Sequence, residues 1–178
     1  MTDPFTKNFN CVQRLLNEYQ KHPKLIVAVD WDDTLFDFHN KGNSHEEVWD
    51  VLRRCDKLGF YIVCFTASLP VRFSSIEKHF ESKGVKLSSI NKNPIPLPFG
   101  NHGKIYYNIL LDDRAGLGSA LETLRTALFI IENTPSSETL SDKNPPETTF
   151  CSDELRKQGK PYPRTCRACG LGPCKNQL

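Results

Sequence analysis

The sequence predicts an α/β protein whose central sheet is open and parallel. Continuous apolar runs of strand length, not alternating ones, occur at residues 25–29, 60–65 and 107–111. Such runs are typical of strands that are covered on both faces. Segments with the apolar spacing of helices lie between and after these runs, at residues 44–58, 72–83 and 120–131. Strands that alternate with helices form right-handed parallel crossovers, so we expect the three strands in one sheet.

Local signals mark where the first helices begin and end. Asp3, followed by proline, is an N-cap signal for a helix whose apolar side chains recur up to Tyr19. Ser44 with Glu47 three residues later forms a capping-box pattern for the helix that follows the first strand. Gly59 is the expected C-terminal stop of that helix.

Composition and charge favour one globular domain with a separate tail. The chain has 178 residues, of which 38% are hydrophobic and 25% charged, as in ordinary soluble domains. No apolar run is long enough to cross a bilayer and the N-terminus lacks the apolar stretch of a secretory signal, which favours a cytoplasmic protein without a membrane partner. We expect a domain at residues 1–133, a polar, proline-containing linker at residues 134–149 and a basic, cysteine-rich tail at residues 150–178.

Acidic side chains follow two of the expected strands. Asp30 and Asp32 follow the first strand, and Asp112 and Asp113 follow the third. Open parallel sheets bind ligands outside the carboxyl ends of their strands, so we expect these carboxylates to meet in one crevice. Mutual repulsion there calls for a cation, and Mg²⁺ prefers a few carboxylates together with waters and phosphate oxygens. The pattern therefore predicts a Mg²⁺ site that clamps a phosphate.

The residues at the strand ends suit phosphoryl transfer. Asp30 can attack phosphorus to give an acyl phosphate, and Asp32 can protonate the leaving oxygen and then activate water. The Thr66 hydroxyl and the Ala67 backbone amide supply donors after the second strand, and Lys104 supplies a positive charge for the phosphate. The alternatives without catalysis are a solvated strand end and a non-catalytic divalent-metal site.

Taken in order, DWDDTL, FTAS, Lys104 and LLDDR resemble the four motifs of the haloacid dehalogenase (HAD) superfamily of phosphatases. The resemblance covers residues 24–125. It implies a three-layer, Rossmann-like (HAD-like) fold and an aspartyl-phosphate mechanism in a catalytic domain. By this resemblance Asp30 is the nucleophile and Asp32 the acid/base, phosphate is bound by Thr66, Ala67 and Lys104, and Mg²⁺ is held by Asp30, Asp32, Asp112 and Asp113.

The chain departs from the family pattern at two positions. Asp33 stands where glycine is commoner, and Trp31 stands where smaller aliphatic side chains are usual. Neither change removes a catalytic group. The stretch between Thr34 and the second strand is too short for a helical cap domain, so the resemblance implies a capless or minimally capped member. Its open site would admit bulky substrates or be closed by a second subunit of a homo-oligomer.

The tail contains a cysteine pattern of its own. A CxxC knuckle and two further thiolates match the ligand types of a structural Zn²⁺ site, with a reduced flexible tail and redox-active thiols as alternatives. The tail carries six Lys/Arg against two Asp/Glu, which suits contact with nucleic acid and equally a solvated segment. The expected zinc ligands are Cys151, Cys166, Cys169 and Cys174. The remaining cysteines lie in apolar periodic segments and are expected as reduced core residues: Cys11, Cys55 and Cys64.

These patterns predict a Mg²⁺-dependent phosphohydrolase that cleaves phosphate monoesters. Its expected partner is a phosphorylated substrate, such as a nucleotide or the end of a polynucleotide. A sugar-phosphate phosphatase is the alternative within the same chemistry. A binding module, in which the basic tail recognises nucleic acid or protein on an inactive scaffold, is the alternative from another class.

Overall fold

The computed structural model of the chain describes residues 6–96 and 103–134. The cysteine pattern of the tail and all but the first residue of the expected linker lie outside the described residues. The elements follow one another in this order: α1 (Asn8–Lys21), β1 (Ile26–Asp30), α2 (Glu46–Lys57), β2 (Tyr61–Phe65), the 3₁₀ turn η2 (Pro70–Arg72), α3 (Phe73–Ser82), β3 (Ser89–Ile90), β4 (Ile109–Leu111) and α4 (Leu117–Asn133).

The four strands form a parallel sheet in the order β3-β2-β1-β4. This arrangement confirms the predicted α/β fold with a parallel, Rossmann-like central sheet. The chain moves outward from β1 to β2 and β3, and then returns to place β4 on the other side of β1. The carboxyl end of β1 is therefore the point where the strand order reverses, and open α/β sheets bind their ligands at such a point.

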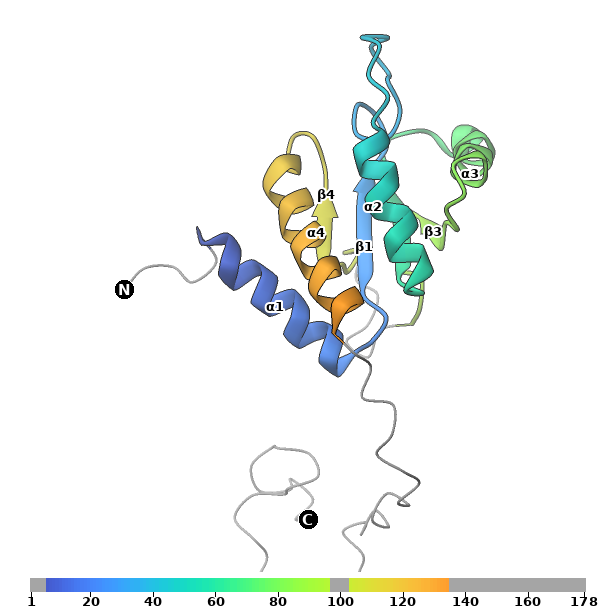
Figure 1. Ribbon diagram of the computed structural model, residues 1–178. Coiled ribbons are helices and arrows are strands. Elements are labelled where there is room, and N and C mark those ends of the chain that lie inside the picture. The colour runs from blue at the N-terminus through green and yellow to red at the C-terminus, as the bar shows by residue number, and fades with distance from the viewer. Residues whose placement is uncertain (1–5, 97–102, 135–178) are drawn as a thin grey trace, which may run out of the picture. The chain divides into compact units, whose positions relative to one another are not determined.

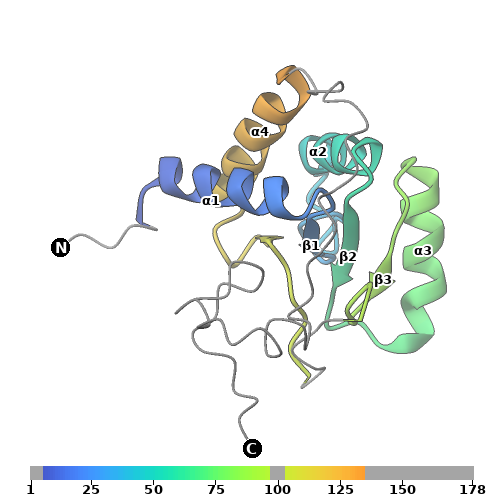
Figure 2. The same cartoon turned by 90° about the horizontal axis from the view of Figure 1, so that it is seen from below.

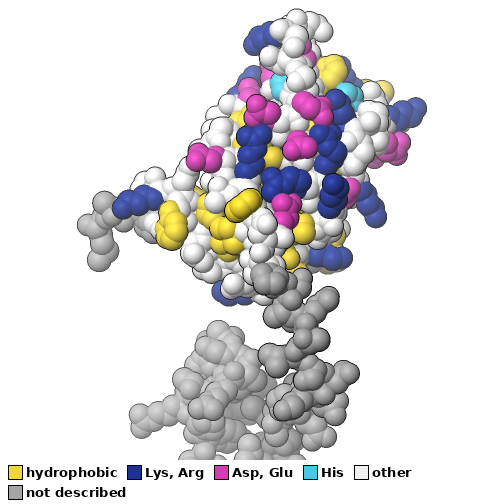
Figure 3. Space-filling view, in the orientation of Figure 1, with side chains coloured by type: hydrophobic (Ala, Val, Ile, Leu, Met, Phe, Trp, Pro, Cys, Tyr) yellow, Lys and Arg dark blue, Asp and Glu magenta, His cyan; other side chains and the backbone are white. Residues whose placement is uncertain are grey.

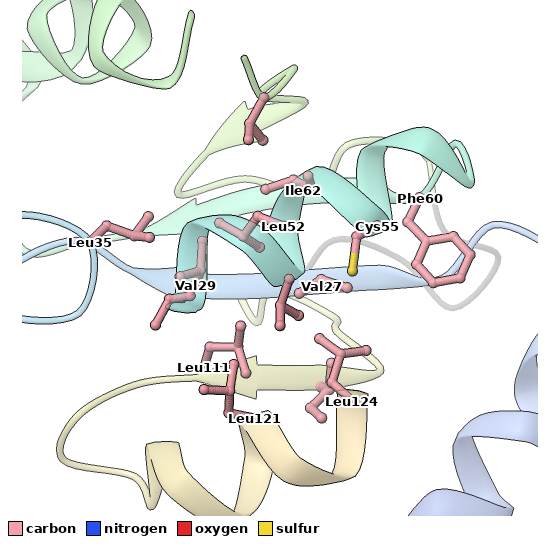
Figure 4. Packing of buried hydrophobic residues seen from close by; sticks show 14 of the residues in the cluster. Val27, Val29, Leu35, Leu52, Cys55, Phe60, Ile62, Leu111, Leu121 and Leu124 are labelled. Atoms are coloured by element: carbon pink, nitrogen blue, oxygen red, sulfur yellow. The ribbon is translucent and has the colours of Figure 1, made fainter. Parts of the chain in front are cut away.

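The helices bury their apolar faces against the sheet and against one another. Figure 1 shows α2 and α4 side by side in front of the sheet, with α1 packed against α4, and Figure 2 shows α3 next to β3. Val27 and Val29 of β1 belong to one buried cluster with residues of all four helices, of which Leu52 of α2 and Leu124 of α4 are examples (Figure 4). No helix of the described part of the chain is long and apolar enough to span a bilayer.

Strand β1 confirms the sequence prediction that its apolar run is covered on both faces, whereas the run at residues 107–111 confirms it only in part, because β4 begins at Ile109 and Tyr107 is 37% exposed. Val27 and Val29 point into the helix-covered cluster, and Ile26 and Ala28, which alternate with them, are also buried. Because both faces of β1 are buried, apolar residues follow one another along the strand instead of alternating with polar ones.

The first helix begins later than the sequence pattern suggested. It starts at Asn8, with Lys7 as an N-cap that offers no side-chain hydrogen bond, whereas the expected cap Asp3 lies outside the described residues. Phe9, which belonged to the expected apolar stripe, is 74% exposed, because the helix turns Val12 toward the core instead. The 3.6-residue period is confirmed from Val12 onward, but Phe9 does not belong to the buried face of the helix.

The expected capping box at the start of α2 is wrong. The helix begins at Glu46 after His45, which has the left-handed conformation with φ 50°, and no N-cap side chain closes the helix end. Ser44 Oγ accepts a hydrogen bond of 3.4 Å from the backbone N–H of Glu46, one residue short of the pattern's position. The predicted stop is confirmed, since Gly59 has φ 72° and its N–H donates to the carbonyl of Asp56 at 2.8 Å.

The fourth strand, β3, was not predicted. It consists of two residues, one of them a serine, and has no apolar run of its own. It exists because Ser89 and Ile90 pair with Val63 and Cys64 of β2. This short strand matters for function because it places Asn91 at the carboxyl end of the sheet.

Cys55 and Cys64 are free thiols. Cys55 and Cys64 are buried, and burial raises the pKa of each thiol to about 12. Cys11 is only partly buried. A thiol with so high a pKa is a poor nucleophile at neutral pH, so Cys55 and Cys64 are core residues, as expected.

The outer faces of α2 and α4 carry side chains of both charges. Figure 3 shows basic and acidic groups interspersed over these helices. Two ion pairs join the helices, Arg54 with Glu132 at 2.8 Å and Arg125 with Glu47 at 2.9 Å. Exposed pairs of this kind are worth about 0–1 kcal/mol each. Because positive and negative side chains are mixed on this face, it is a poor binding surface for a polyanion.

Candidate active site at the carboxyl end of β1

A tight turn follows β1 and sets the directions of its acidic residues. The backbone N–H groups of Leu35 and Phe36 both donate to the carbonyl of Trp31, at 3.1 and 3.0 Å. Asp32 forms an isolated bridge with Phe36. The chain therefore folds back immediately after Asp30 and keeps Asp30 and Asp32 together at the end of the strand.

Asp33 stands in this turn with a backbone conformation that favours glycine. Asp33 has φ 58°, in the left-handed region that glycine adopts freely and that aspartate tolerates better than most residues. Its carboxylate is hydrogen-bonded to His39 across the loop. Burial raises the pKa of Asp33, but the hydrogen bond and charge of His39 outweigh that effect and leave the pKa below its usual value.

A buried threonine connects the two acidic strand ends. Thr34 is fully buried, and its hydroxyl donates to Asp30 Oδ2 at 3.4 Å and accepts from the backbone N–H of Asp113 at 3.1 Å. The hydroxyl thus joins the residue that ends β1 to the loop that follows β4. The sequence analysis did not assign Thr34 a role, although it lies inside the DWDDTL motif.

Asp112 is oriented by the loop that leads into α4. Its Oδ1 accepts hydrogen bonds from the backbone N–H groups of Arg114, at 2.8 Å, and Ala115, at 3.1 Å. This is the bonding of an Asx turn, and it is a structural role that does not need catalysis. Because Oδ1 is held in this way, the direction of the whole carboxylate is set before any ligand binds.

The electrostatics of Asp30 differ from those of an ordinary surface carboxylate. Burial raises the pKa of Asp30 to about 6; the hydrogen bond from the Trp31 backbone opposes this shift, and the negative charges of Asp112 and Asp113 add to it. An ionised Asp30 is therefore unfavourable where it stands. A cation bound between these carboxylates would relieve both the burial cost and the repulsion.

Two carboxylate oxygens in the turn after β1 are buried without a hydrogen-bond partner among the described residues: Asp32 Oδ1 and Asp33 Oδ1. Within residues 6–96 and 103–134, no group of three or more His, Cys, Asp or Glu side chains is arranged to hold a metal by itself. Mg²⁺ binds through one or two carboxylates and keeps several waters, so a small set of hard oxygen ligands is what it requires.

Thr66 lies directly after β2 and is held by a residue that follows β3. The backbone N–H of Thr66 donates to Asn91 Oδ1 at 2.8 Å, and Asn91 Nδ2 donates to the Thr66 carbonyl at 2.6 Å. Thr66 Oγ1 accepts from the backbone N–H of Ser68 at 3.0 Å, and the neighbouring Ala67 is exposed. Nothing in the sequence indicated a role for Asn91, because β3, which positions this residue, has no apolar run that would predict a strand.

Lys104 is the expected site residue that the described contacts do not bring to the carboxylates. It lies before the amino end of β4, whereas Asp112 follows the carboxyl end of that strand. Its backbone carbonyl accepts a weak 3.5 Å hydrogen bond from Asn93 Nδ2. Lys104 is exposed, and no hydrogen bond or ion pair of the described residues joins its ammonium to Asp30 or Asp112. Its role in phosphate binding stays a prediction.

The surroundings of the site are open. No helix lies between β1 and α2, so that stretch contains no helical cap. A groove of about 460 Å³ lies between α3 and β3, with Phe73 and Ile90 in its wall, and one of about 370 Å³ lies along α1. Neither of these two grooves is lined by the carboxylates at the end of β1.

Comparison with known proteins does not identify a family for the chain. No protein-family model matches the chain, and no curated protein matches it significantly. Among solved structures, a conserved protein from Bacteroides thetaiotaomicron matches with a TM-score of 0.46 and 15% sequence identity, over 61% of this chain and 90% of that one.

Proposed function

We propose that this chain is a Mg²⁺-dependent phosphohydrolase of the HAD type, which cleaves phosphate monoesters through an aspartyl-phosphate intermediate. The substrate class we favour is a nucleotide or a nucleic-acid end. The observation that carries the proposal is the link made by Thr34, which holds the Asp30 carboxylate against the Asp113 backbone. Two acidic strand ends far apart in sequence thereby meet at the switch point of a parallel sheet.

In this proposal Asp30 and Asp32 divide the chemistry. The ionised Asp30 attacks phosphorus and forms the acyl phosphate, while Asp32 gives a proton to the leaving oxygen. Asp32 then accepts a proton from the water that cleaves the intermediate and is ready for another cycle. The hydrogen bond from Thr34 to Asp30 Oδ2 helps to orient the carboxylate for attack.

Phosphate binding is assigned to groups beside these carboxylates. The Thr66 hydroxyl and the Ala67 amide stand after β2, next to the end of β1, and Asn91 keeps Thr66 in place. Mg²⁺, held by Asp30 and Asp112 with the backbone carbonyl of Asp32, would supply positive charge that offsets the repulsion between the nucleophile and phosphate. A zinc site in the tail and a role of the tail in substrate capture are separate proposals on residues that the structure does not describe.

The test is phosphate release from p-nitrophenyl phosphate by the full chain, with Mg²⁺ and with EDTA. We expect activity that requires Mg²⁺ and that falls about 10³-fold or more in Asp30→Asn. Asp50→Asn is the matched control, because Asp50 lies on α2 and its side chain is 67% exposed. Activity that survives Asp30→Asn would reject the mechanism, and equal losses in both variants would point to damage elsewhere. Mass spectrometry of acid-quenched wild type should find phosphate on the peptide that contains Asp30.

A further inference from the structure

Three aromatic rings form a column that leads from the core to the surface beside the catalytic turn. Phe80 stacks on Trp31 with 6.1 Å between ring centroids, and Trp31 stacks on Phe36 at 5.4 Å with ring planes only 4° apart. Phe80 is fully buried and Trp31 is 6% exposed, but Phe36 is 37% exposed. One face of the Phe36 ring is thus covered by Trp31, and the column ends at an accessible ring. The unusual Trp31 of the first motif is the middle ring of this column.

The end of the column is rigid. The edge of the His79 ring meets both Trp31, at 5.2 Å, and Phe36, at 6.2 Å, in nearly perpendicular contacts. The Trp49 indole N–H donates to the Leu35 carbonyl at 3.2 Å, which ties the turn to α2. A ring held in one orientation loses little conformational freedom when a ligand stacks on it. The Phe36 ring is therefore preorganised for binding.

Phe36 is also placed next to the proposed acid. Phe36 and Asp32 are joined by the isolated bridge, and the Phe36 carbonyl accepts the backbone N–H of Asp33 at 2.8 Å. A residue that protonates the leaving oxygen must lie beside the group attached to that oxygen. Because their backbones are neighbours, we expect the leaving group within reach of the exposed Phe36 ring. Phe129, which is 64% exposed, lies on α4 and not in this turn.

We propose that Phe36 binds the leaving group of the substrate by stacking, and that this leaving group contains a planar aromatic ring. The inference rests on the proposed function, since it takes Asp32 as the acid. It narrows the substrates to phosphate monoesters of aromatic alcohols or of nucleosides. A nucleobase and a phenyl ring share the flat π surface that a stacked phenylalanine recognises. Sugar phosphates and polyol phosphates lack this surface.

The experiment compares three substrates in the presence of Mg²⁺: adenosine 5′-monophosphate, phenyl phosphate and glycerol phosphate. We expect Phe36→Leu to lower the ratio of kcat/KM for an aromatic substrate to kcat/KM for glycerol phosphate by about tenfold, mainly through KM. Phe36→Tyr retains the ring and should retain the ratio. Phe129→Leu is the matched control and should leave all three values unchanged, because Phe129 is 64% exposed on α4.

The outcomes separate this inference from the proposed function. If Phe36→Leu lowers the kcat/KM ratio for the nucleotide alone, the leaving group is a nucleoside. If it lowers the ratio for phenyl phosphate alone, the leaving group is an aryl alcohol. Either result supports stacking on Phe36. The inference is overturned if Phe36→Leu has the same ratio of kcat/KM values as wild type, or if Phe36→Tyr lowers the ratio as much as Phe36→Leu does. In either case, hydrolysis of glycerol phosphate would still support the proposed function.

A binding measurement covers the case in which wild type hydrolyses none of the three. Calorimetric titration of Asp30→Asn with adenosine 5′-monophosphate, phenyl phosphate and glycerol phosphate then measures the affinity of each ligand in the absence of hydrolysis. Tighter binding of an aromatic ligand that disappears in the Asp30→Asn, Phe36→Leu double variant supports stacking although the proposed function has failed. No preference for either aromatic ligand overturns the inference as well.

Discussion

Replacement of Asp30, the proposed nucleophile, by asparagine should stabilise the metal-free protein at neutral pH. Burial and the charges of Asp112 and Asp113 raise the pKa of Asp30 from 3.8 to about 6. The proton that the folded state binds stabilises it fully below pH 3.8, and this contribution is lost as the pH rises through about 6. At pH 7.5 the folded chain therefore holds an ionised group in an unfavourable place, and Asp30→Asn removes the charge but keeps the shape.

The magnitude follows from the size of the shift. A pKa change of about two pH units corresponds to about 3 kcal/mol. Asp30 is only partly buried, and solvent screening reduces this figure to about 1–2 kcal/mol. We therefore expect Asp30→Asn to raise the free energy of unfolding by about 1–2 kcal/mol at pH 7.5, which is a rise of about 3–8 °C in Tm.

The assay is urea unfolding followed by circular dichroism, in EDTA, at pH 7.5 and pH 4.5. At pH 4.5 the difference between Asp30→Asn and wild type should shrink to roughly a third, because wild-type Asp30 is then mostly protonated when folded. Mg²⁺ should stabilise wild type more than the variant. The exposed control Asp50→Asn should change stability little at either pH. A destabilised Asp30→Asn at pH 7.5, or a gain that is the same at both pH values, would refute the reasoning.

Four further predictions concern other residues of the site and the tail. Thr34→Val leaves the N–H of Asp113 without its acceptor and should cost about 0.5–1.5 kcal/mol in urea unfolding, whereas Thr34→Ser should cost less; equal costs would contradict the hydrogen-bond account. Asn91→Asp sets a carboxylate against the Thr66 carbonyl, so we expect a loss of about 1–3 kcal/mol and a higher KM for p-nitrophenyl phosphate, and an unchanged KM would remove Asn91 from phosphate binding. If Asp30 is the nucleophile, it must be ionised to attack, and bound Mg²⁺ should lower its pKa below the metal-free value of about 6. The acid limb of the kcat/KM profile should therefore move to lower pH as the Mg²⁺ concentration rises, and an acid limb that does not move would contradict this account. If the cysteines of the tail bind zinc, elemental analysis should find about one equivalent in wild type and less in Cys166→Ser, and under a tenth of an equivalent in wild type would defeat the zinc site.

The acidic strand ends were predictable because their pattern depends on local geometry. A strand buried on both faces must be apolar throughout, so the polar residue that ends it is conspicuous. Asp30 and Asp112 end such runs, and parallel pairing brings equivalent ends to one edge. The order of the strands, with β1 between β2 and β4, then places the two acids beside each other.

The supporting groups could not be predicted from local pattern. Asn91 is polar, follows a strand of two residues and has φ 51°, so it resembles an ordinary turn residue. Its role depends on its hydrogen bond with Thr66, a residue that follows another strand. The contribution of Thr34 likewise depends on the backbone of Asp113, which lies far away in the sequence.

The sequence by itself determined the α/β fold, the parallel strands and the acidic residues at their ends, because these depend on which residues are apolar and at what period they recur. The tertiary structure alone decided which polar groups meet. Thr34 joins the ends of β1 and β4, Asn91 holds Thr66, and Phe36 stands beside Asp32 at the end of an aromatic column. The physical reason is that a hydrogen bond or a ring contact depends on distances between atoms, and folding brings together residues whose order along the chain carries no record of that distance.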